Sequence, residues 1–258
     1  IGTGWTQGSG QSVNGVLYNK FTQGAATLLV QDVVNDAPTL NALFNASIAE
    51  DASEQTVNLA GITAGGGESQ PLRVTSTSSN TGLIPNPAVT YTSANATGSI
   101  AFTPVTDQTG TATITVMVED GGLDNNLSTA GDNATFSRTF DVTVNPVNDV
   151  PTLDALSNLS IAEDASEQTV SLAGITAGGG ESQPLRVTAS SSSTGLIPNP
   201  TVTYTTANTT GSIAFTPVAD QSGTATITVT VEDGGLDGNL NTAGDNATFS
   251  RTFDVTVN

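Results

Sequence analysis

Residues 36–145 and 149–258 are two copies of one sequence, since 94 of their 110 aligned positions are identical. A period this long is typical of tandem domains and not of a solenoid built from short repeats. The copies meet at Val147-Asn148-Asp149-Val150-Pro151, and the same phrase occurs 113 residues earlier as Val34-Asn35-Asp36-Ala37-Pro38. The sequence therefore predicts an N-terminal arm and two domains, over residues 1–35, 36–148 and 149–258.

The arm ends in one apolar stretch. Phe21–Gln31 leads directly into the first Asn-Asp phrase, as the end of the first copy leads into the second phrase. We therefore predict one strand within residues 21–35, in the place that the last strand of an upstream repeat would take. Residues 1–20 are rich in Gly, Ser, Gln and Asn, which indicates a loop followed by extended chain.

Each copy contains short alternating stretches of Thr, Val and Ile that are separated by turn residues, and none shows sustained helical periodicity. Thr is expected to face outward and Ile or Val inward. In the first copy the expected strands are Leu40–Ile48, Gln55–Leu59, Leu72–Thr75, Val89–Thr92, Ser99–Phe102, Thr111–Val118 and Thr139–Val144. About seven strands in each copy predict an all-β fold, namely tandem immunoglobulin-like Greek-key sandwiches, with a barrel as the alternative.

Composition limits the chemistry that the chain can perform. The sequence has no Cys and no His, so thiolate metal sites, disulfides and the usual general base are all missing. Paired carboxylates can cleave glycosides, but only 5% of the residues are aromatic, which leaves little to form a sugar platform. We therefore expect that the chain is not an enzyme.

Acidic residues outnumber basic ones by 24 to 5, giving a net charge of -19. This charge disfavours nucleic acid and anionic membrane surfaces as partners and favours cations. No apolar run approaches the roughly 18–20 residues that a membrane-spanning helix needs. The arm carries only Asp32 and Lys20, so the acidity belongs to the repeats.

The sandwich topology predicts which acidic residues meet at the junction of the two copies. The turn with Glu50-Asp51, the turn with Asp107 and the linker Asn148-Asp149 all lie at the downstream end of the first copy. The long loop after the sixth strand of the second copy faces back toward them. It contributes Asp233, Asp237 and Asp245.

So many carboxylates repel one another and raise each other's pKa unless a counter-charge is present. Calcium accepts six to eight oxygen ligands in flexible geometry and needs neither His nor Cys, whereas magnesium demands a stricter octahedron. The predicted cofactor is therefore calcium.

Two further groups of acids have no partner group within the sequence. One group lies at the upstream end of the first copy and the other at the downstream end of the second copy. These half-sites comprise Asp36, Asp120, Asp124 and Asp132 in the first case and Glu163, Asp164 and Asp220 in the second. They would close around shared calcium if identical subunits met end to end.

Each of these acids also has a structural interpretation without a metal. Asn148-Asp149 is compatible with an Asx-turn that Pro151 stiffens. Glu50-Asp51 is compatible with a solvated turn, and Asp107 with capping of its own turn. The long loop is compatible with an ordinary acidic hairpin loop or with a calcium site of its own.

The Val-Asn-Asp-x-Pro phrase at residues 147–151, together with the strand pattern of residues 36–258, resembles the tandem cadherin-like repeats of large bacterial extracellular proteins. Cadherins bind interdomain calcium through a Glu after the first strand, an Asn-Asp linker and Asp pairs of the next domain. The resemblance assigns these roles to Glu50, to Asn148-Asp149, and to Asp233 with Asp237. Asn145-Pro146-Val147 precedes Asn148 in place of the longer Asp-x-Asn-Asp run of cadherins.

The predicted function is that of a structural segment of an extracellular or cell-surface protein. Calcium would stiffen it into a rod, a fibre or matrix element, or an adhesin stalk. Its partners would be neighbouring repeats or identical subunits. The alternative is an adhesin module that binds a surface glycan or protein through its acidic loops.

Overall fold

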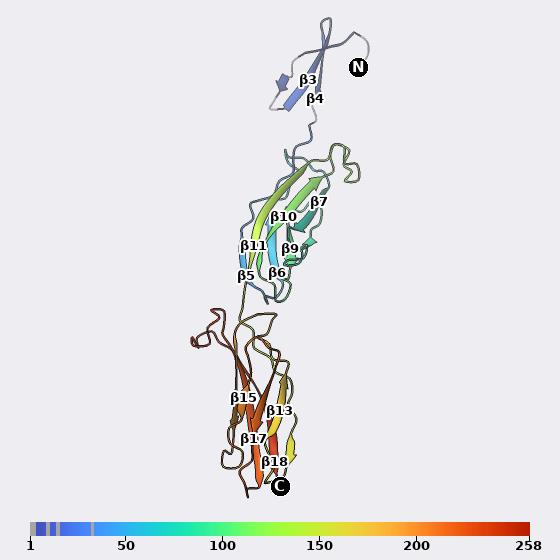
Figure 1. The fold of residues 1–258 in the computed structure, drawn as a ribbon. Coiled ribbons are helices and arrows are strands. Elements are labelled where there is room, and N and C mark those ends of the chain that lie inside the picture. Colours follow the sequence, from blue (N-terminus) through green and yellow to red (C-terminus); the bar gives the residue numbers. More distant parts are fainter. Residues whose placement is uncertain (1–3, 9–10, 14–15, 32–33) are drawn as a thin grey trace. The chain divides into compact units, whose positions relative to one another are not determined.

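The computed structural model describes residues 4–8, 11–13, 16–31 and 34–258. These residues form β-strands, turns and irregular segments (Figure 1), and no helix among them is long and apolar enough to cross a membrane. The predicted all-β fold is confirmed.

The chain divides into two compact units, each of which is described by itself. The first unit comprises residues 1–47, 53–103 and 111–143. The second unit comprises residues 48–52, 104–110 and 144–258. Two turns that the sequence places in the first copy, 48–52 and 104–110, thus belong to the second unit. The predicted boundaries at residues 36 and 149 stay predictions.

The first copy of the repeat contains seven strands in two sheets. They are β5 (Ala46–Ala49), β6 (Gln55–Ala60), β7 (Leu72–Ser78), β8 (Ala88–Thr90), β9 (Thr97–Phe102), β10 (Gly110–Asp120) and β11 (Thr135–Asn145). One sheet has the order β5-β11-β10-β7 and the other the order β6-β9-β8.

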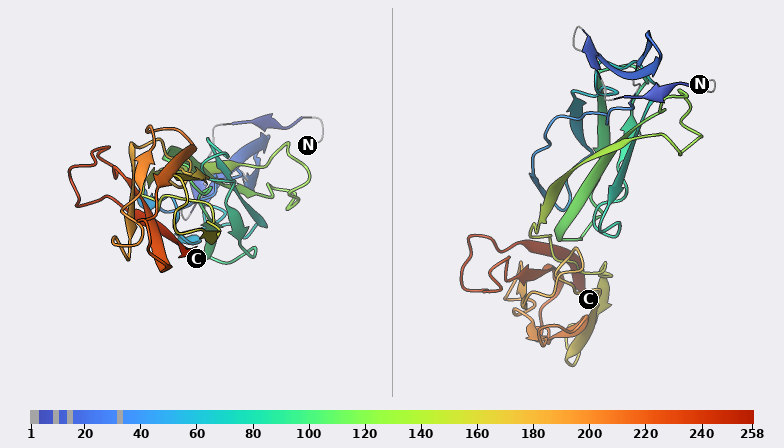
Figure 2. Two further views of the ribbon diagram at one scale, coloured as in Figure 1. Left: turned by 60° about the horizontal axis from the view of Figure 1, so that its bottom comes forward. Right: turned by 90° about the horizontal axis from the view of Figure 1, so that it is seen from above.

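The second copy repeats this arrangement (Figure 2). Its strands are β12 (Leu159–Ile161), β13 (Gln168–Ala173), β14 (Leu185–Ser191), β15 (Thr201–Thr203), β16 (Thr210–Phe215), β17 (Gly223–Asp233) and β18 (Thr248–Val257). The sheet orders are β12-β18-β17-β14 and β13-β16-β15, and β12 runs parallel to β18. Successive strands repeatedly change sheets, which gives the predicted Greek-key sandwich of immunoglobulin-like type instead of a barrel.

The first strand is shorter than predicted. Leu40–Ile48 was expected as one strand, but β5 covers only residues 46–49. Thr39 forms an isolated bridge with Thr63, beside β6, whereas β5 pairs with β11 in the other sheet. The intervening residues therefore cross between the sheets, and no continuous ladder can form there.

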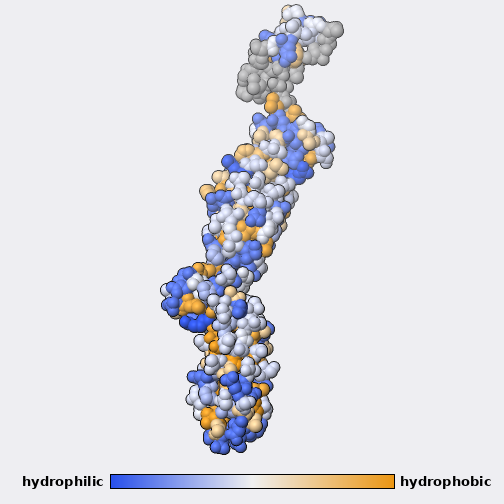
Figure 3. Space-filling model, in the orientation of Figure 1, coloured by the Kyte–Doolittle hydropathy of each residue, from blue (hydrophilic) through white to orange (hydrophobic). Residues whose placement is uncertain are grey.

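Alternation of side chains along the long strands builds the core. In β17, Ala225, Ile227, Val229 and Val231 are all fully buried, while the Thr residues between them are partly exposed. The same pattern in β10 buries its Ile and Val residues. This confirms the prediction that Ile and Val face inward and Thr outward. On the face drawn in Figure 3, hydrophobic and hydrophilic residues are interspersed.

The arm contains more strand than predicted. β1 (Thr6–Gln7), β2 (Gln11–Val13), β3 (Val16–Gln23) and β4 (Ala26–Gln31) form one sheet. β4 pairs with one edge of β3, and β1 and β2 pair with its other edge. The single strand predicted within residues 21–35 therefore belongs to a hairpin. Of the loop and extended chain predicted over residues 1–20, the described part contains β1, β2 and the start of β3.

Candidate metal centre

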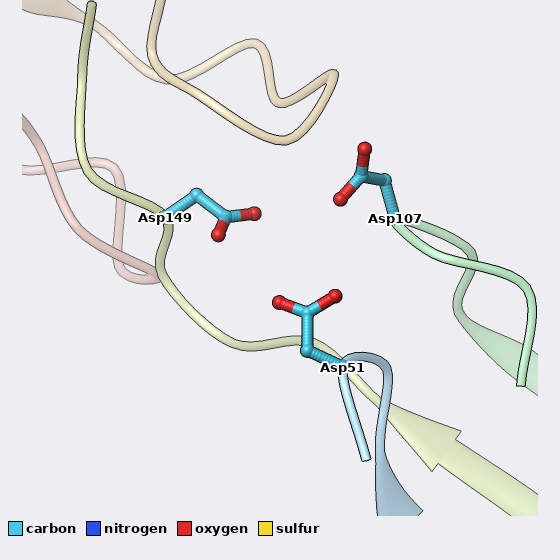
Figure 4. Close-up of side chains that lie close together, drawn as sticks. All are labelled: Asp51, Asp107 and Asp149. Carbon is cyan, nitrogen blue, oxygen red and sulfur yellow. The ribbon is translucent and has the colours of Figure 1, made fainter. Parts of the chain in front are cut away.

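Three carboxylates from distant parts of the sequence converge in the second unit (Figure 4). One oxygen each from Asp51, Asp107 and Asp149 lies within 4.8 Å of the other two. Among the described residues, no other group of three or more acidic side chains meets this condition. The three residues follow β5, precede β10 and follow β11, respectively.

Asp51 is positioned by a tight turn that is anchored to the linker. Ala52 N donates to Ala49 O at 3.2 Å, which closes the turn, and Glu50 N donates to Asn145 O at 3.0 Å. The Glu50 side chain is only 4% exposed, and its Oε1 accepts a hydrogen bond from Val147 N at 2.8 Å. The turn and the start of the linker are thus bonded to each other.

Asp107 adopts a left-handed backbone conformation, with φ of 57°. Asp and Asn tolerate this conformation better than most residues other than glycine. Gln108 N donates to Val105 O at 3.3 Å, and the Gln108 side-chain amide donates to Asp107 O at 2.8 Å. The turn therefore uses the backbone of Asp107 and leaves its carboxylate exposed toward the cluster.

Asp149 lies against a glycine-rich loop. A Cβ added to Gly179 would clash with Asp149 Oδ2 and stand 3.3 Å from Asp107 Oδ1, so a side chain here would displace the Asp149 carboxylate. Asp149 N donates to Glu181 Oε2 at 3.1 Å, on the far side of the same loop. The triple glycine thus allows a fourth carboxylate, that of Glu181, to approach the cluster.

The electrostatic consequence appears in two pKa values. The pKa of Asp149 is raised by burial and, in decreasing order, by the charges of Asp51, Asp107 and Glu50. The pKa of Glu181 is also raised, mainly by burial and then by the neighbouring carboxylates of Asp149, Glu50 and Asp233, despite the hydrogen bond from the Asp149 backbone. Ionised carboxylates are therefore disfavoured here without a compensating positive charge.

A second polar group adjoins the first through the linker. Asn148 Nδ2 donates to Asp233 Oδ1 at 3.1 Å and to Asp245 O at 2.9 Å, while Gln183 Nε2 donates to Asn148 Oδ1 at 2.6 Å. Asp233 is fully buried, and its Oδ1 also accepts hydrogen bonds from Gly235 N and Ala247 N. Asn148 and Asp149 thus join a buried carboxylate on one side to the three-Asp cluster on the other.

Several buried oxygens of this region have no hydrogen-bond partner in the described part of the chain. They are Asp149 Oδ2, Gln183 Oε1, Asp233 Oδ2 and Asn246 Oδ1. Buried polar atoms are normally paired, so an orphaned set of acceptors calls for a donor or a cation. All four are oxygens, the ligand type that hard cations prefer.

The long loop after β17 was predicted to contribute Asp237 and Asp245, but these carboxylates are bonded within the loop. Asp237 accepts from Asn239 N at 2.8 Å and from Thr242 Oγ1 at 2.5 Å, and Asp245 Oδ2 accepts from Asp237 N at 3.2 Å. In the first unit Asp124 and Asp132 make the same contacts. Neither pair belongs to the three-Asp group, and their role in cation binding stays a prediction.

The remaining predicted residues fall into two separate places. Asp36 N donates to Glu68 Oε2 at 3.2 Å, and Asp120 is fully buried and accepts from Asn35 Nδ2 at 3.0 Å. Asp36 begins the first copy and Asp120 ends β10, and they correspond to Asp149 and Asp233. Glu163, Asp164 and Asp220 lie in the turns after β12 and before β17.

Sequence reasoning missed the glycine-loop residues Glu181 and Gln183 and their first-copy counterparts. The available signal was three consecutive glycines before Glu-Ser-Gln. All three glycines have positive φ, so the loop can pass close to another chain segment. Glu232 is not available in the same way, because Arg186 and then Asn246 hold its carboxylate and lower its pKa.

The donor set fits a hard divalent cation. It consists of carboxylate and amide oxygens, with neither thiolate nor imidazole in the sequence. At least one oxygen of the cluster, Asp149 Oδ2, is buried without a partner in the described structure. The arrangement offers oxygen ligands alone.

No protein-family model and no curated protein sequence matches the chain. Solved structures with a similar fold include Drosophila N-cadherin EC1-4, with 14% identity and a TM-score of 0.41 over 94% of this chain and 57% of that chain. Human mucin-like protocadherin EC1-2 has 14% identity and a TM-score of 0.38, over 86% of this chain and 98% of that one.

Domains 4 and 5 of the S-layer protein SbsC have 19% identity and a TM-score of 0.32, over 71% of this chain and 70% of that chain. These are likenesses of fold alone, and none bears on what this chain binds. The bacterial repeat family predicted from the linker phrase stays a prediction.

The raised pKa of Asp149 predicts a pH dependence in the absence of divalent cations. A folded-state pKa above the ordinary value of 3.8 means that the folded chain binds this proton more tightly than the unfolded chain does. The associated stability is present below that value and is lost as the pH rises through the raised pKa. In chelator, Asp149→Asn should therefore gain a few degrees in Tm over the parent chain as the pH rises toward neutral.

Thermal unfolding followed by circular dichroism between about pH 3 and pH 7 measures this difference. The matched control is Glu54→Gln, which removes one exposed negative charge outside the cluster. Equal gains for both variants would show that the effect comes from the net charge and not from the cluster.

Proposed function

We propose that this chain is a structural segment of an extracellular repeat protein and that calcium at Asp51, Asp107 and Asp149 stiffens the connection between its two repeats. The observation that supports this most directly is the convergence of three carboxylates to within 4.8 Å, from segments about 40 to 60 residues apart. Two turns of the first repeat and the linker to the second supply them.

Repulsion supports a bound cation. Two unit charges about 4 Å apart repel by about 1 kcal/mol in water and by about 4 kcal/mol near a protein surface. Asp51, Asp107 and Asp149 form three such pairs, and the buried Glu50 adds a fourth charge. A divalent cation would attract each carboxylate and so offset the repulsion between them. Asp149 Oδ2 would then gain a partner.

Calcium fits this donor set better than other common cations. Transition metals favour imidazole or thiolate ligands, which the sequence lacks, and magnesium demands near-ideal octahedral geometry. Calcium accepts six to eight oxygens at variable angles, which suits carboxylates on separate turns. Asp51, Asp107 and Asp149 would hold it, with Glu50 and Glu181 alongside.

The mechanical consequence follows from the position of the ligands. Residues 146–150 form no regular secondary structure, so few main-chain bonds limit bending there. A cation shared by Asp149 and the two turns would cross-link the linker to the ends of β5, β9, β10 and β11. Extracellular calcium-binding modules have dissociation constants of about 10⁻⁴ to 10⁻³ M, which suits an extracellular rod or stalk.

Calcium should stabilise the chain through this cluster. We expect a calcium-dependent rise in Tm for the parent chain, and Asp51→Asn should reduce the apparent affinity about tenfold or more because one charged ligand is lost. Isothermal titration calorimetry and thermal unfolding at increasing calcium concentrations measure this effect. Glu54→Gln, in the same segment but outside the cluster, should behave like the parent.

An unchanged Tm and no binding heat at millimolar calcium would refute the proposal. Magnesium at the same concentration should give a smaller rise, since its geometry suits the site less well.

The fit of Asp149 against the glycine loop gives an independent test. Gly179→Ala places a Cβ where Asp149 Oδ2 stands, so it should displace the carboxylate and weaken calcium binding about tenfold or more. Gly180→Ala is the control, because Gly180 also has positive φ but no atom lies within 4 Å of its added Cβ. Both variants carry backbone strain of about 1–2 kcal/mol, and only the first should lose calcium affinity.

Stiffening can be measured directly, because a chain without cysteine accepts two introduced labels cleanly. Gly82→Cys and Gly195→Cys place dyes on equivalent exposed turns of the two units. Single-molecule energy transfer should give a narrow distribution in calcium and a broad one in chelator. If calcium binds but the energy-transfer distribution is equally broad in calcium and in chelator, the site binds calcium without stiffening the connection.

A further inference from the structure

We propose that calcium also joins two copies of this chain head to tail. The head site consists of Asn35, Asp36, Glu68, Gln70 and Asp120 of one copy, and the tail site consists of Glu163, Asp164 and Asp220 of another. The inference rests on the proposed function, because it assigns the same cation chemistry to a contact between chains.

The head site has the geometry of the acceptor that Asn148 and Asp149 form. Asn35 Nδ2 lies 3.0 Å from Asp120 Oδ1, and the corresponding distance from Asn148 to Asp233 is 3.1 Å. Gln70 Nε2 lies 2.6 Å from Asn35 Oδ1, as Gln183 does from Asn148. Asp36 N lies 3.2 Å from Glu68 Oε2, and Asp149 N lies 3.1 Å from Glu181 Oε2.

The head site contains buried acceptors that nothing in the described structure satisfies. Asp120 is fully buried and Gln70 is 8% exposed, yet Asp120 Oδ2 and Gln70 Oε1 have no hydrogen-bond partner. The neighbouring Asn133 Oδ1 is unpartnered as well. The equivalent oxygens of Asp233, Gln183 and Asn246 are also without a hydrogen-bond partner, so the same unpaired buried acceptors occur at both places.

The head site lacks the carboxylates that complete the site at Asp149. There, Glu50, Asp51 and Asp107 approach from two turns of the preceding repeat. The segment that precedes the head site has no Asp or Glu among residues 1–31, and Asp32 is its single acid. Residues 1–35 therefore cannot supply three carboxylates.

The tail site carries these three carboxylates in the required conformation. Asp220 has φ of 58° and Asp107 has φ of 57°. Glu163 N donates to Asn258 O at 2.9 Å, as Glu50 N does to Asn145 O at 3.0 Å, and Ala165 and Ala52 close identical turns. The tail site thus repeats the main-chain geometry of the turns that complete the site at Asp149, with Glu163 exposed where Glu50 is buried.

A second copy of the chain is the occupant that these observations favour. Both sites are acidic, and each chain carries a net charge of -19, so direct contact without a cation is repulsive. Divalent cations would neutralise the contact and satisfy the orphaned oxygens at the same time. Association should therefore require calcium, and chelator should reverse it.

Two variants of the full chain test the pairing. Asp36→Asn/Glu68→Gln disables the head site, and Asp164→Asn/Asp220→Asn disables the tail site, where Asn keeps the left-handed conformation accessible. Sedimentation velocity in about 1 mM calcium should show the parent chain growing from its 25.9 kDa monomer into dimers and longer species as its concentration rises. Each variant alone should associate at least about tenfold more weakly.

The mixture of the two variants is the decisive experiment. One intact head and one intact tail remain, so the mixture should form heterodimers that do not grow further. Glu54→Gln/Glu167→Gln removes the same number of exposed charges outside both sites and should assemble like the parent. Assembly that persists in both single-site variants would overturn the inference and indicate a contact elsewhere, such as the strands of the arm.

The outcome separates this inference from the proposed function. If the parent chain binds calcium through Asp51 but remains a monomer at every concentration, head-to-tail joining is wrong and the stiffening proposal stands. If calcium produces neither a rise in Tm nor assembly, both fail together.

Discussion

Repulsion between carboxylates is the constraint on which the rest of this structure depends. The fold brings Asp51, Asp107 and Asp149 to within 4.8 Å of one another and buries Glu50 beside them. Burial, and then the charges of Asp51, Asp107 and Glu50, raise the pKa of Asp149. An unfolded chain would keep these charges apart, so folding without a cation opposes its own electrostatics, and the sandwich cores must supply the stability that offsets this repulsion.

The cluster is held by rigid neighbours and not by its own contacts. Asp51 lies in a turn that is bonded to Asn145, and Asp107 lies in the turn that precedes the long strand β10. The linker is fixed by Asn148, which bonds to the buried Asp233. Because the side chains are positioned by surrounding structure, a ligand that binds their oxygens would add a connection between the two turns and the linker.

Much of this could be predicted from the sequence, for reasons that differ between elements. The alternation in Thr111–Val118 predicts β10 because burial on a pleated strand has a period of two residues. The meeting of Asp51 and Asp107 near Asp149 follows from Greek-key topology alone. The contribution of Glu181 could not be found in this way, because it depends on how closely three glycines approach the linker.

The loop of Asp237 shows another limitation. Asn239 N and Thr242 Oγ1 each donate to one oxygen of Asp237 within the loop, which local sequence does not reveal, and its role as a ligand stays a prediction. The strands β1 and β2 escaped prediction because main-chain pairing with β3, and not an apolar pattern, holds them in place.

Tandem duplication explains why the same local arrangements occur twice in this chain. Copying a repeat copies its acceptor at one end and its acidic turns at the other. The remaining acceptor at Asp36 and Asp120, and the remaining turns with Asp164 and Asp220, keep the local geometry of the pair at Asp149. Any cation that closes the internal junction therefore has the same chemical reason to close one between chains, and the net charge of -19 makes that closure dependent on the cation.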